Sequence, residues 1–180
     1  MKARLKKLII STIGVMSVFS VFTFTSCESD KCKTIVCAYE GNICTEGQCI
    51  CASGYEGPQC ETISRKKFLG TWVVTEVGSV SDASTYSTTI QTGVSLHEIK
   101  IENLWNFIET DVSAFVRKDT LIIPQQEIEG YTIVGEGYVE DDKYYGDNGR
   151  IILKYKVTDN ETTVTDDFGY DGGYPSIWVR

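Results

Sequence analysis

The sequence predicts a mainly β protein, in which a small disulfide-rich unit precedes an antiparallel β-barrel or sandwich of about eight strands. Two observations lead to this fold class. Six cysteines crowd residues 32–60, and after residue 68 short runs alternate apolar and polar residues between turn signals. No stretch shows a convincing helical period. A chain of 180 residues has room for one ordinary domain and something small beside it.

The chain opens with an export signal. A basic start is followed by an uncharged stretch over residues 8–24, and small polar residues then lead to Cys27. This is the order of a secretory signal peptide. The stretch is also long enough to suggest a permanent membrane anchor, but its Ser, Thr and Gly content makes it a weak span. We therefore expect residues 1–26 to be a cleaved signal peptide.

The residues Phe24-Thr25-Ser26-Cys27 resemble the lipobox of bacterial lipoproteins. The resemblance implies that Cys27 receives a diacylglyceryl group, with palmitate among its acyl chains, and that residues 27–31 form a tether. The family usually has an aliphatic residue where Phe24 stands, so plain signal-peptidase cleavage stays open as the alternative. Removing Cys27 from the thiol pool leaves an even six cysteines, which favours the lipid.

The mature protein is acidic. Loss of the four basic residues in the signal segment takes the formal net charge from −8 to −12. An acidic protein is not attracted electrostatically to nucleic acid or to anionic lipid, so we expect no nucleic-acid partner. Membrane attachment is expected through the lipid anchor only. The expected location is the outer membrane or the cell surface.

Six cysteines in so short a stretch predict a stapled module, because a unit of this size cannot bury a useful core. Thiols of an exported chain meet oxidising conditions and pair. Spacing alone leaves every connectivity open. The alternative is a zinc site, but His97 is the only histidine and the cysteine pairs lack zinc-finger spacing.

The run from Cys49 to Cys60, with its Gly54-Tyr55 pair and Gly57, resembles the second half of an EGF-like domain. The earlier cysteine spacing fits the first half, so the resemblance covers residues 32–60. It implies that the first cysteine pairs with the third, the second with the fourth and the fifth with the sixth. These pairs are Cys32–Cys44, Cys37–Cys49 and Cys51–Cys60.

No metal, cofactor or catalytic residue is expected. Lys31 stands where calcium-binding EGF-like domains have Glu or Gln. There is no nucleophile elbow and no phosphate loop. Carboxylates at residues 140–142 and 166–167 could form a glycosidase pair, but both clusters fall beside predicted turns, where Asp serves turn chemistry. We therefore expect a protein that is not an enzyme.

After a polar link over residues 61–67, residues 68–180 predict half-buried antiparallel strands. The clearest alternation runs over residues 96–102, 131–139 and 151–157. Pro124 is expected to end the strand that starts at Thr120, since proline removes a ladder donor. Residues 147–149 and 159–160 are hairpin signals.

Gly70-Thr71-Trp72 near the first strand, with Trp178 and Arg180 on the last, is similar to the lipocalin and calycin pattern. In those barrels a tryptophan from the opening strand packs against an arginine from the closing one. The resemblance implies a closed barrel with that contact. A generic barrel or sandwich is the alternative.

Tyrosines in predicted loops are the candidate recognition residues, because Tyr combines contact area with a polar tip. They are Tyr144, Tyr145, Tyr170 and Tyr174. We expect a binding protein whose partner, a protein or glycan at the envelope, stays unidentified. A carrier with a hollow barrel is the alternative, favoured by Gly135 and Gly137; a hydrolase would need two carboxyls converging in a cleft.

Overall fold

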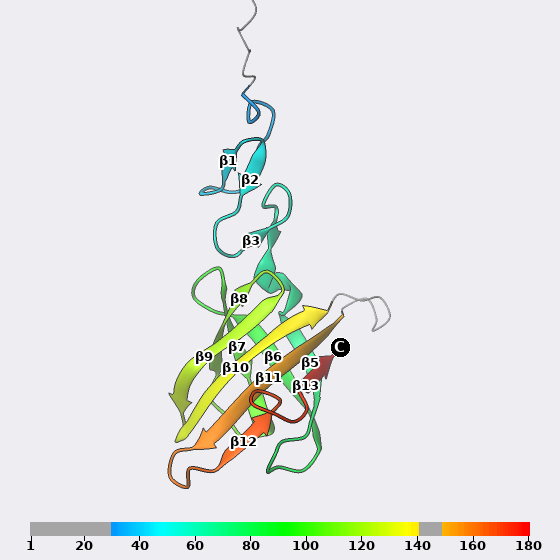
Figure 1. Cartoon of the computed structure of the whole chain (residues 1–180), viewed down its shortest axis with the longest axis vertical. Coiled ribbons are helices and arrows are strands. Elements are labelled where there is room, and N and C mark those ends of the chain that lie inside the picture. Colours follow the sequence, from blue (N-terminus) through cyan, green and yellow to red (C-terminus); the bar gives the residue numbers. More distant parts are fainter. Residues whose placement is uncertain (1–29, 141–148) are drawn as a thin grey trace, which may run out of the picture.

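The computed structural model describes residues 30–140 and 149–180. A disulfide-rich N-terminal region stands on one end of a closed antiparallel barrel of eight strands (Figure 1). The predicted signal peptide (residues 1–26), Cys27, Tyr144 and Tyr145 lie outside the described residues, as do Asp141 and Asp142. None of the described helices is long and apolar enough to cross a membrane.

The N-terminal region, here called the disulfide module, contains two small hairpins. Strand β1 (Ile43–Thr45) pairs with β2 (Gln48–Ile50), and β3 (Tyr55–Glu56) pairs with β4 (Thr62–Ile63). Tyr39 stacks on Tyr55 with ring centroids 4.8 Å apart. Little else is buried here, so covalent bonds must hold the module together.

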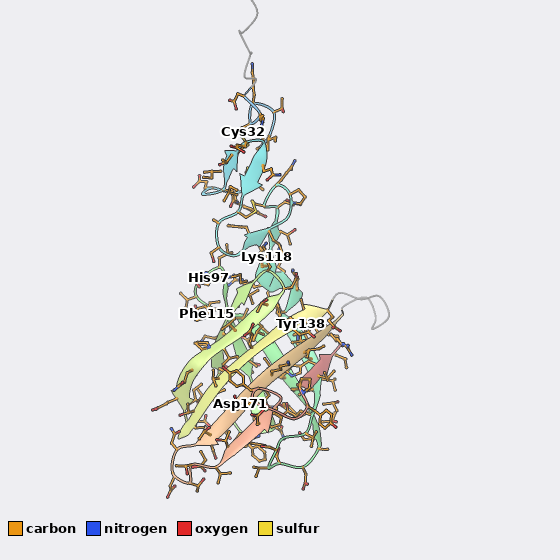
Figure 2. The ribbon with its side chains drawn as sticks, in the orientation of Figure 1. Cys32, His97, Phe115, Lys118, Tyr138 and Asp171 are labelled. Atoms are coloured by element: carbon orange, nitrogen blue, oxygen red, sulfur yellow. A yellow bond between two sulfur atoms is a disulfide. The ribbon has the colours of Figure 1, made fainter. Side chains whose placement is uncertain are left out.

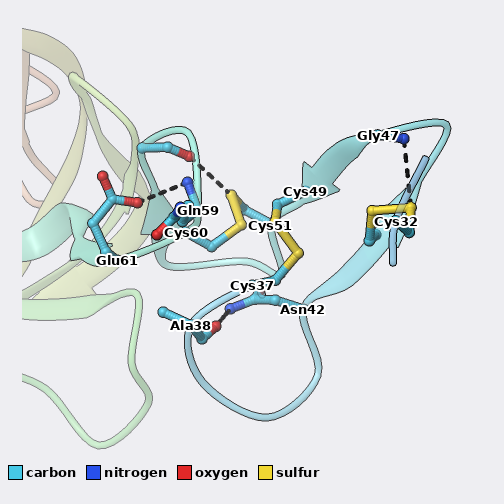
Figure 3. The surroundings of a disulfide bond; sticks show 12 residues. Cys32, Cys37, Ala38, Asn42, Gly47, Cys49, Cys51, Gln59, Cys60 and Glu61 are labelled. Carbon is cyan, nitrogen blue, oxygen red and sulfur yellow. Dashed lines mark hydrogen bonds between the residues drawn. A yellow bond between two sulfur atoms is a disulfide. The ribbon is translucent and has the colours of Figure 1, made fainter. Parts of the chain in front are cut away.

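Three disulfides supply those bonds (Figure 3). They have the pairing that the EGF-like resemblance implies, and their Cα–Cα distances are 5.8, 5.7 and 5.3 Å. The pairs are Cys32–Cys44, Cys37–Cys49 and Cys51–Cys60. Each closes a short loop and contributes about 2–4 kcal/mol by the chain-entropy model. The region is consistent with an EGF-like module.

The segment expected as a polar link is regular structure that joins module to barrel. It contains β4 and the 3-10 helix η2 (Ser64–Lys67). The Arg65 guanidinium donates to the carbonyl oxygens of Ser95, at 2.7 Å, and of Glu98, at 3.2 Å, in the barrel. The Lys67 ammonium forms ion pairs with Glu56 of the module and Asp119 of the barrel. These contacts hold the two parts together.

The barrel is an up-and-down meander. Its strands are β5 (Gly70–Glu76), β6 (Ser84–Thr92), β7 (Glu98–Glu102), β8 (Val112–Arg117), β9 (Thr120–Ile128), β10 (Tyr131–Glu140), β11 (Arg150–Asp159), β12 (Thr165–Phe168) and β13 (Ser176–Val179). Strand β13 pairs with both β11 and β5, which closes the ring. Strand β12 pairs with the far half of β11, so β12 and β13 together occupy the eighth position.

Alternation within the strands builds the core as the sequence predicts. On β11, Ile151, Leu153, Tyr155 and Val157 all point inward and are buried. The glycines of β10 serve close packing rather than a hollow: a Cβ on Gly135 would lie 2.6 Å from the Cβ of Tyr155. Large side chains, among them Trp72, Trp178 and Phe168, fill the interior.

The expectation that Pro124 ends a strand is wrong. Strand β9 continues to Ile128, and its pairing with β10 shifts register at this point. Gln126 pairs with Ile133 and Ile123 pairs with Gly135, so Pro124 and Gln125 lie opposite the single residue Val134. This is a β-bulge, which leaves a position unpaired and so tolerates a residue without an N–H.

Trp72 and Arg180 make the contact that the calycin resemblance implies. The Arg180 guanidinium lies 4.0 Å from the centre of the buried Trp72 ring and donates to the Lys67 carbonyl oxygen at 2.7 Å. The Trp72 indole N–H donates to the Phe68 carbonyl oxygen at 2.7 Å. The segment before β5 is thereby fixed to the end of β13, where the barrel closes.

Arg180→Lys should lower the free energy of unfolding by about 1 kcal/mol, because lysine keeps the charge but loses the planar stack on Trp72. Urea unfolding followed by tryptophan fluorescence measures the change. Arg117→Lys, at an exposed position at the end of β8, is the matched control and should have little effect. Equal effects of the two substitutions would contradict a structural role for the stack.

Candidate functional site

The barrel end that lies away from the disulfide module, here called the distal mouth, carries the candidate site (Figure 1). The β5–β6, β7–β8 and β11–β12 loops meet there, together with the start of β10. The opposite end is covered by the module: Figure 2 shows His97, Phe115 and Lys118 on that side. A ligand therefore has open access at the distal mouth.

A pocket of about 470 Å³ opens at the distal mouth; we call it the distal pocket. Its apolar lining consists of Val80, Trp105, Phe107, Tyr131, Val157 and Val164. Its polar lining consists of Ser81, Asp159, Thr162 and Asp166. A concave, mostly apolar surface with a few converging polar groups is the usual form of a small-molecule site.

Trp105 is the central side chain of the distal pocket. It lies on the short 3-10 segment η3 (Leu104–Asn106) and has φ 62°, with Asn103 at 54° and Asn106 at 56°. Asn tolerates this left-handed region, whereas a tryptophan enters it only when its surroundings enforce it. The Trp105 backbone N–H donates to the Tyr86 hydroxyl at 2.9 Å, and the indole N–H donates to Asp166 Oδ2 at 3.1 Å.

Two further aromatic rings pack on Trp105. The Phe107 centroid lies 5.1 Å away with the ring planes at 60°, and the Tyr131 centroid lies 5.3 Å away at 76°. Edge-to-face pairs of this kind are favourable beyond their buried area. Phe107 is still 67% exposed, so the cluster is open to solvent on one side.

Asp166 fixes the loops around Trp105. The sequence reading treats it as a turn residue, but it points inward from β12 and is only 5% exposed. Its Oδ1 accepts from the backbone N–H groups of Val80, at 2.9 Å, and Ser81, at 3.3 Å. Its Oδ2 accepts from the Trp105 indole N–H, so this one carboxylate holds the β5–β6 and β7–β8 loops together.

A second buried carboxyl lies deeper in the barrel. Glu76 accepts hydrogen bonds from the hydroxyls of Ser176 at 2.6 Å, Tyr86 at 2.8 Å and Tyr155 at 3.0 Å. Burial raises the pKa of the Glu76 carboxyl, against these hydrogen bonds, which lower it. Burial also raises the pKa of Tyr86. Because Tyr86 receives the Trp105 N–H, this network connects the barrel interior to the distal pocket.

The recognition tyrosines predicted from the sequence lie elsewhere. Tyr170 and Tyr174 belong to the β12–β13 loop and do not line the distal pocket. Tyr174 is 75% exposed, and the Lys156 ammonium lies 5.0 Å from the centre of the Tyr170 ring. Tyr170 instead borders a hollow on the barrel wall with Tyr138 and Lys154.

Of the two carboxylate clusters considered as a glycosidase pair, the members that the structure describes are not brought together. Glu140 pairs with Arg150 on β11, and Asp166 pairs with Val157 on the same strand. At about 3.3 Å per residue these positions are about 23 Å apart. A glycosidase pair needs roughly 5–10 Å. Glu140 instead forms an ion pair with Arg150.

The central residues of the distal pocket were not predicted from the sequence, although some patterns in the sequence point to them. Glu76 shares the parity of Trp72 and Val74 on β5, which places it inside. Trp105 and Phe107 follow the strand predicted over residues 96–102 and belong to a short apolar stretch, residues 104–108, that is interrupted by Asn106. Nothing local in the sequence brings either segment near Asp166, because that proximity depends on barrel closure.

No protein-family model matches the sequence, and no curated protein matches it. Within residues 30–140 and 149–180, no cluster of three or more His, Cys, Asp or Glu side chains is placed to hold a metal ion. Every buried side-chain polar atom in this part of the chain has a hydrogen-bond partner. A function therefore has to be inferred from the chemistry of the distal pocket.

Glu76→Gln should change how stability depends on pH. Because the folded-state pKa of Glu76 is raised above 4.5, its contribution to stability is fully present below that value and is lost as pH rises through the folded pKa. Gln does not titrate. The free energy of unfolding of the wild type should therefore fall relative to that of the variant as the pH rises above about 4.5.

Urea unfolding at a series of pH values measures this difference. Comparison with the variant is needed because Asp159 and Glu129 have lowered pKa values and act in the opposite direction in both proteins. A difference that stays constant with pH, or that grows in favour of the wild type, would contradict the assignment of Glu76 as a buried titrating carboxyl.

Proposed function

We propose that the chain is an exported, lipid-anchored binding protein whose barrel takes up a small, mainly apolar ligand at the distal mouth. The observation that carries the proposal is the distal pocket itself. Its volume of about 470 Å³ falls in the ordinary range of small-molecule sites. Its aromatic lining is partly exposed, and exposed aromatic clusters on monomeric proteins usually mark a binding surface.

Packing of the barrel supports a shallow site rather than a deep one. Trp72, Trp178, Tyr155 and Phe168 are fully or almost fully buried and fill the interior behind the pocket. Tyr155 stacks on Phe168 with centroids 4.5 Å apart. The ligand would therefore lie between the loops of the distal mouth, and we do not assign the chain to carriers that enclose a ligand along the barrel axis.

We assign the disulfide module, as an EGF-like unit, the role of a spacer. It stands at the opposite end of the barrel from the distal pocket (Figure 1), and Cys27 precedes its first cysteine, Cys32, by five residues in the sequence. A lipid on Cys27 would hold the protein by the module end and leave the distal mouth facing outward. The barrel, in its calycin-like form, is then the recognition unit.

A binding role also agrees with the state of the two buried carboxyls. Both oxygens of Asp166 and both oxygens of Glu76 already accept hydrogen bonds. A general acid or base must be within reach of a substrate proton, and these groups are engaged in holding loops and strands. We therefore propose binding without catalysis.

Cys27→Ala should abolish labelling by radioactive or clickable palmitate and release the protein from the membrane fraction. The physical reason is that the thiol is the acceptor of the diacylglyceryl group and stable attachment needs the acyl chains. Ser29→Ala, in the same tether, is the control and should be labelled normally. Unchanged labelling of the Cys27→Ala protein would contradict lipid anchoring.

Phe107→Ala should weaken ligand binding at the distal pocket about fivefold, the effect of losing an aromatic contact worth about 1 kcal/mol. The probe is N-phenyl-1-naphthylamine, a neutral apolar dye whose fluorescence rises on leaving water. Titration of the purified protein gives its dissociation constant. Because Phe107 is 67% exposed, its truncation should leave the fold intact.

Phe115→Ala is the matched control, because Phe115 is also an exposed phenylalanine but lies at the module end of the barrel. It should leave the dissociation constant unchanged. Absence of saturable dye binding, or equal effects of the two variants, would contradict a small-molecule site at the distal mouth.

A further inference from the structure

The lining of the distal pocket combines two kinds of side chain that suit the same ligand chemistry. Two aromatic rings stand at steep angles to the ring of Trp105, at 60° for Phe107 and 76° for Tyr131. Their faces therefore turn in different directions. An aromatic face carries partial negative charge and attracts a cation within about 6 Å of the ring centre.

Two carboxylates line the same pocket, Asp159 and Asp166. Asp159 Oδ1 accepts from the backbone N–H groups of Glu161 at 2.8 Å and Thr162 at 2.9 Å, and these bonds lower the pKa of its carboxyl. The groups that donate these hydrogen bonds to Asp159, and those of Val80, Ser81 and Trp105 that donate to Asp166, are all neutral. The pocket thus brings negative charge to its wall.

No basic side chain balances this charge within the lining. The ten lining residues include no Lys, Arg or His, and in the described part of the chain neither Asp159 nor Asp166 forms an ion pair. The whole protein is also acidic, with a formal charge of −8. A carboxylate, sulfate or phosphate ligand would be repelled by such a wall, and a neutral ligand would gain nothing from it.

We propose that the distal pocket selects a soluble organic cation, a quaternary ammonium or protonated amine with a short apolar part. Its positive centre would lie against the faces of Trp105, Phe107 and Tyr131, with Asp159 and Asp166 supplying opposite charge. The apolar part would contact Val80, Val157 and Val164. This assignment rests on the proposed small-molecule site and adds the charge class of its ligand.

A metal ion does not fit the same residues. Asp166 is engaged by Val80, Ser81 and Trp105, and no cluster of three metal-ligating side chains exists within residues 30–140 and 149–180. Aromatic faces are poor ligands for a hard divalent cation, which takes oxygen ligands. The pocket volume likewise suits an organic molecule rather than a bare ion.

The test compares choline with 3,3-dimethylbutan-1-ol, a neutral molecule of the same shape, as competitors of N-phenyl-1-naphthylamine. Choline should displace the dye at least about tenfold more effectively than the alcohol, because only choline gains from the rings and the carboxylates. Equal displacement would overturn the cation assignment while leaving the small-molecule site in place. Saturable dye binding itself is the separate test of that site.

One pair of variants tests whether the Asp159 carboxylate causes the preference for choline. Asp159→Asn keeps a side-chain oxygen for the turn but removes the charge, and should reduce the advantage of choline about threefold to tenfold. Glu161→Gln removes one charge from the same exposed loop outside the lining and should not. Equal losses in these two variants would mean a general field effect and would overturn the assignment of Asp159.

Phe107→Leu separates the aromatic face from apolar area. Leucine retains contact with an apolar group, so displacement by the neutral alcohol should stay the same while displacement by choline weakens. A parallel loss for both ligands would overturn the role of the ring face. Sedimentation with phosphatidylcholine vesicles distinguishes the source of the cation: binding to vesicles without binding to free choline would overturn the assignment to a soluble ligand.

Discussion

Closure of the barrel by β13 is the constraint on which the rest of the structure depends. Strand β13 pairs with β11 on one side and β5 on the other, and this pairing closes the meander of β5 to β11 into a ring. Arg180 on Trp72 fixes this join at the module end. Closure also places Ser176 beside Glu76, although a hundred residues separate them. The buried polar network therefore exists only in the closed ring.

The polar network and the aromatic cluster form one unit rather than two. Tyr86 donates to Glu76 and accepts from Trp105, so its hydroxyl lies between the interior and the distal pocket. Asp166 holds the same tryptophan from the other side of the mouth. This double hold accounts for the left-handed backbone of Trp105, because strained conformations persist where the surroundings determine them. The loops of the mouth are therefore held in a defined arrangement, which would reduce the entropy lost when the proposed ligand binds.

Local patterns in the sequence predicted most of the fold. Alternation found β7, β10 and β11, and the EGF-like resemblance supplied the disulfide pairs. The prediction that the strand ends at Pro124 was wrong, because a rule based on the local sequence does not include the β-bulge that the pairing of β9 with β10 forms at that point.

The distal pocket was harder to predict. Tyr170 and Tyr174 have the composition of a recognition loop, whereas the site is formed by Trp105, Phe107 and Asp166, which meet only after the ring closes. Residues that approach through long-range pairing leave no trace in a local window, and one sequence contains no record of which distant segments meet.

The joint between module and barrel has a consequence for how the protein presents itself. Arg65 binds the barrel, Lys67 forms ion pairs with both parts, and β4 lies immediately before η2 without an intervening loop. These contacts hold the module and the barrel together as one unit. If Cys27 carries the proposed lipid, the direction in which the distal mouth faces is set by this joint between module and barrel. A shorter or longer module would then change the distance between the membrane and the distal mouth. The angle between the module and the barrel would stay the same.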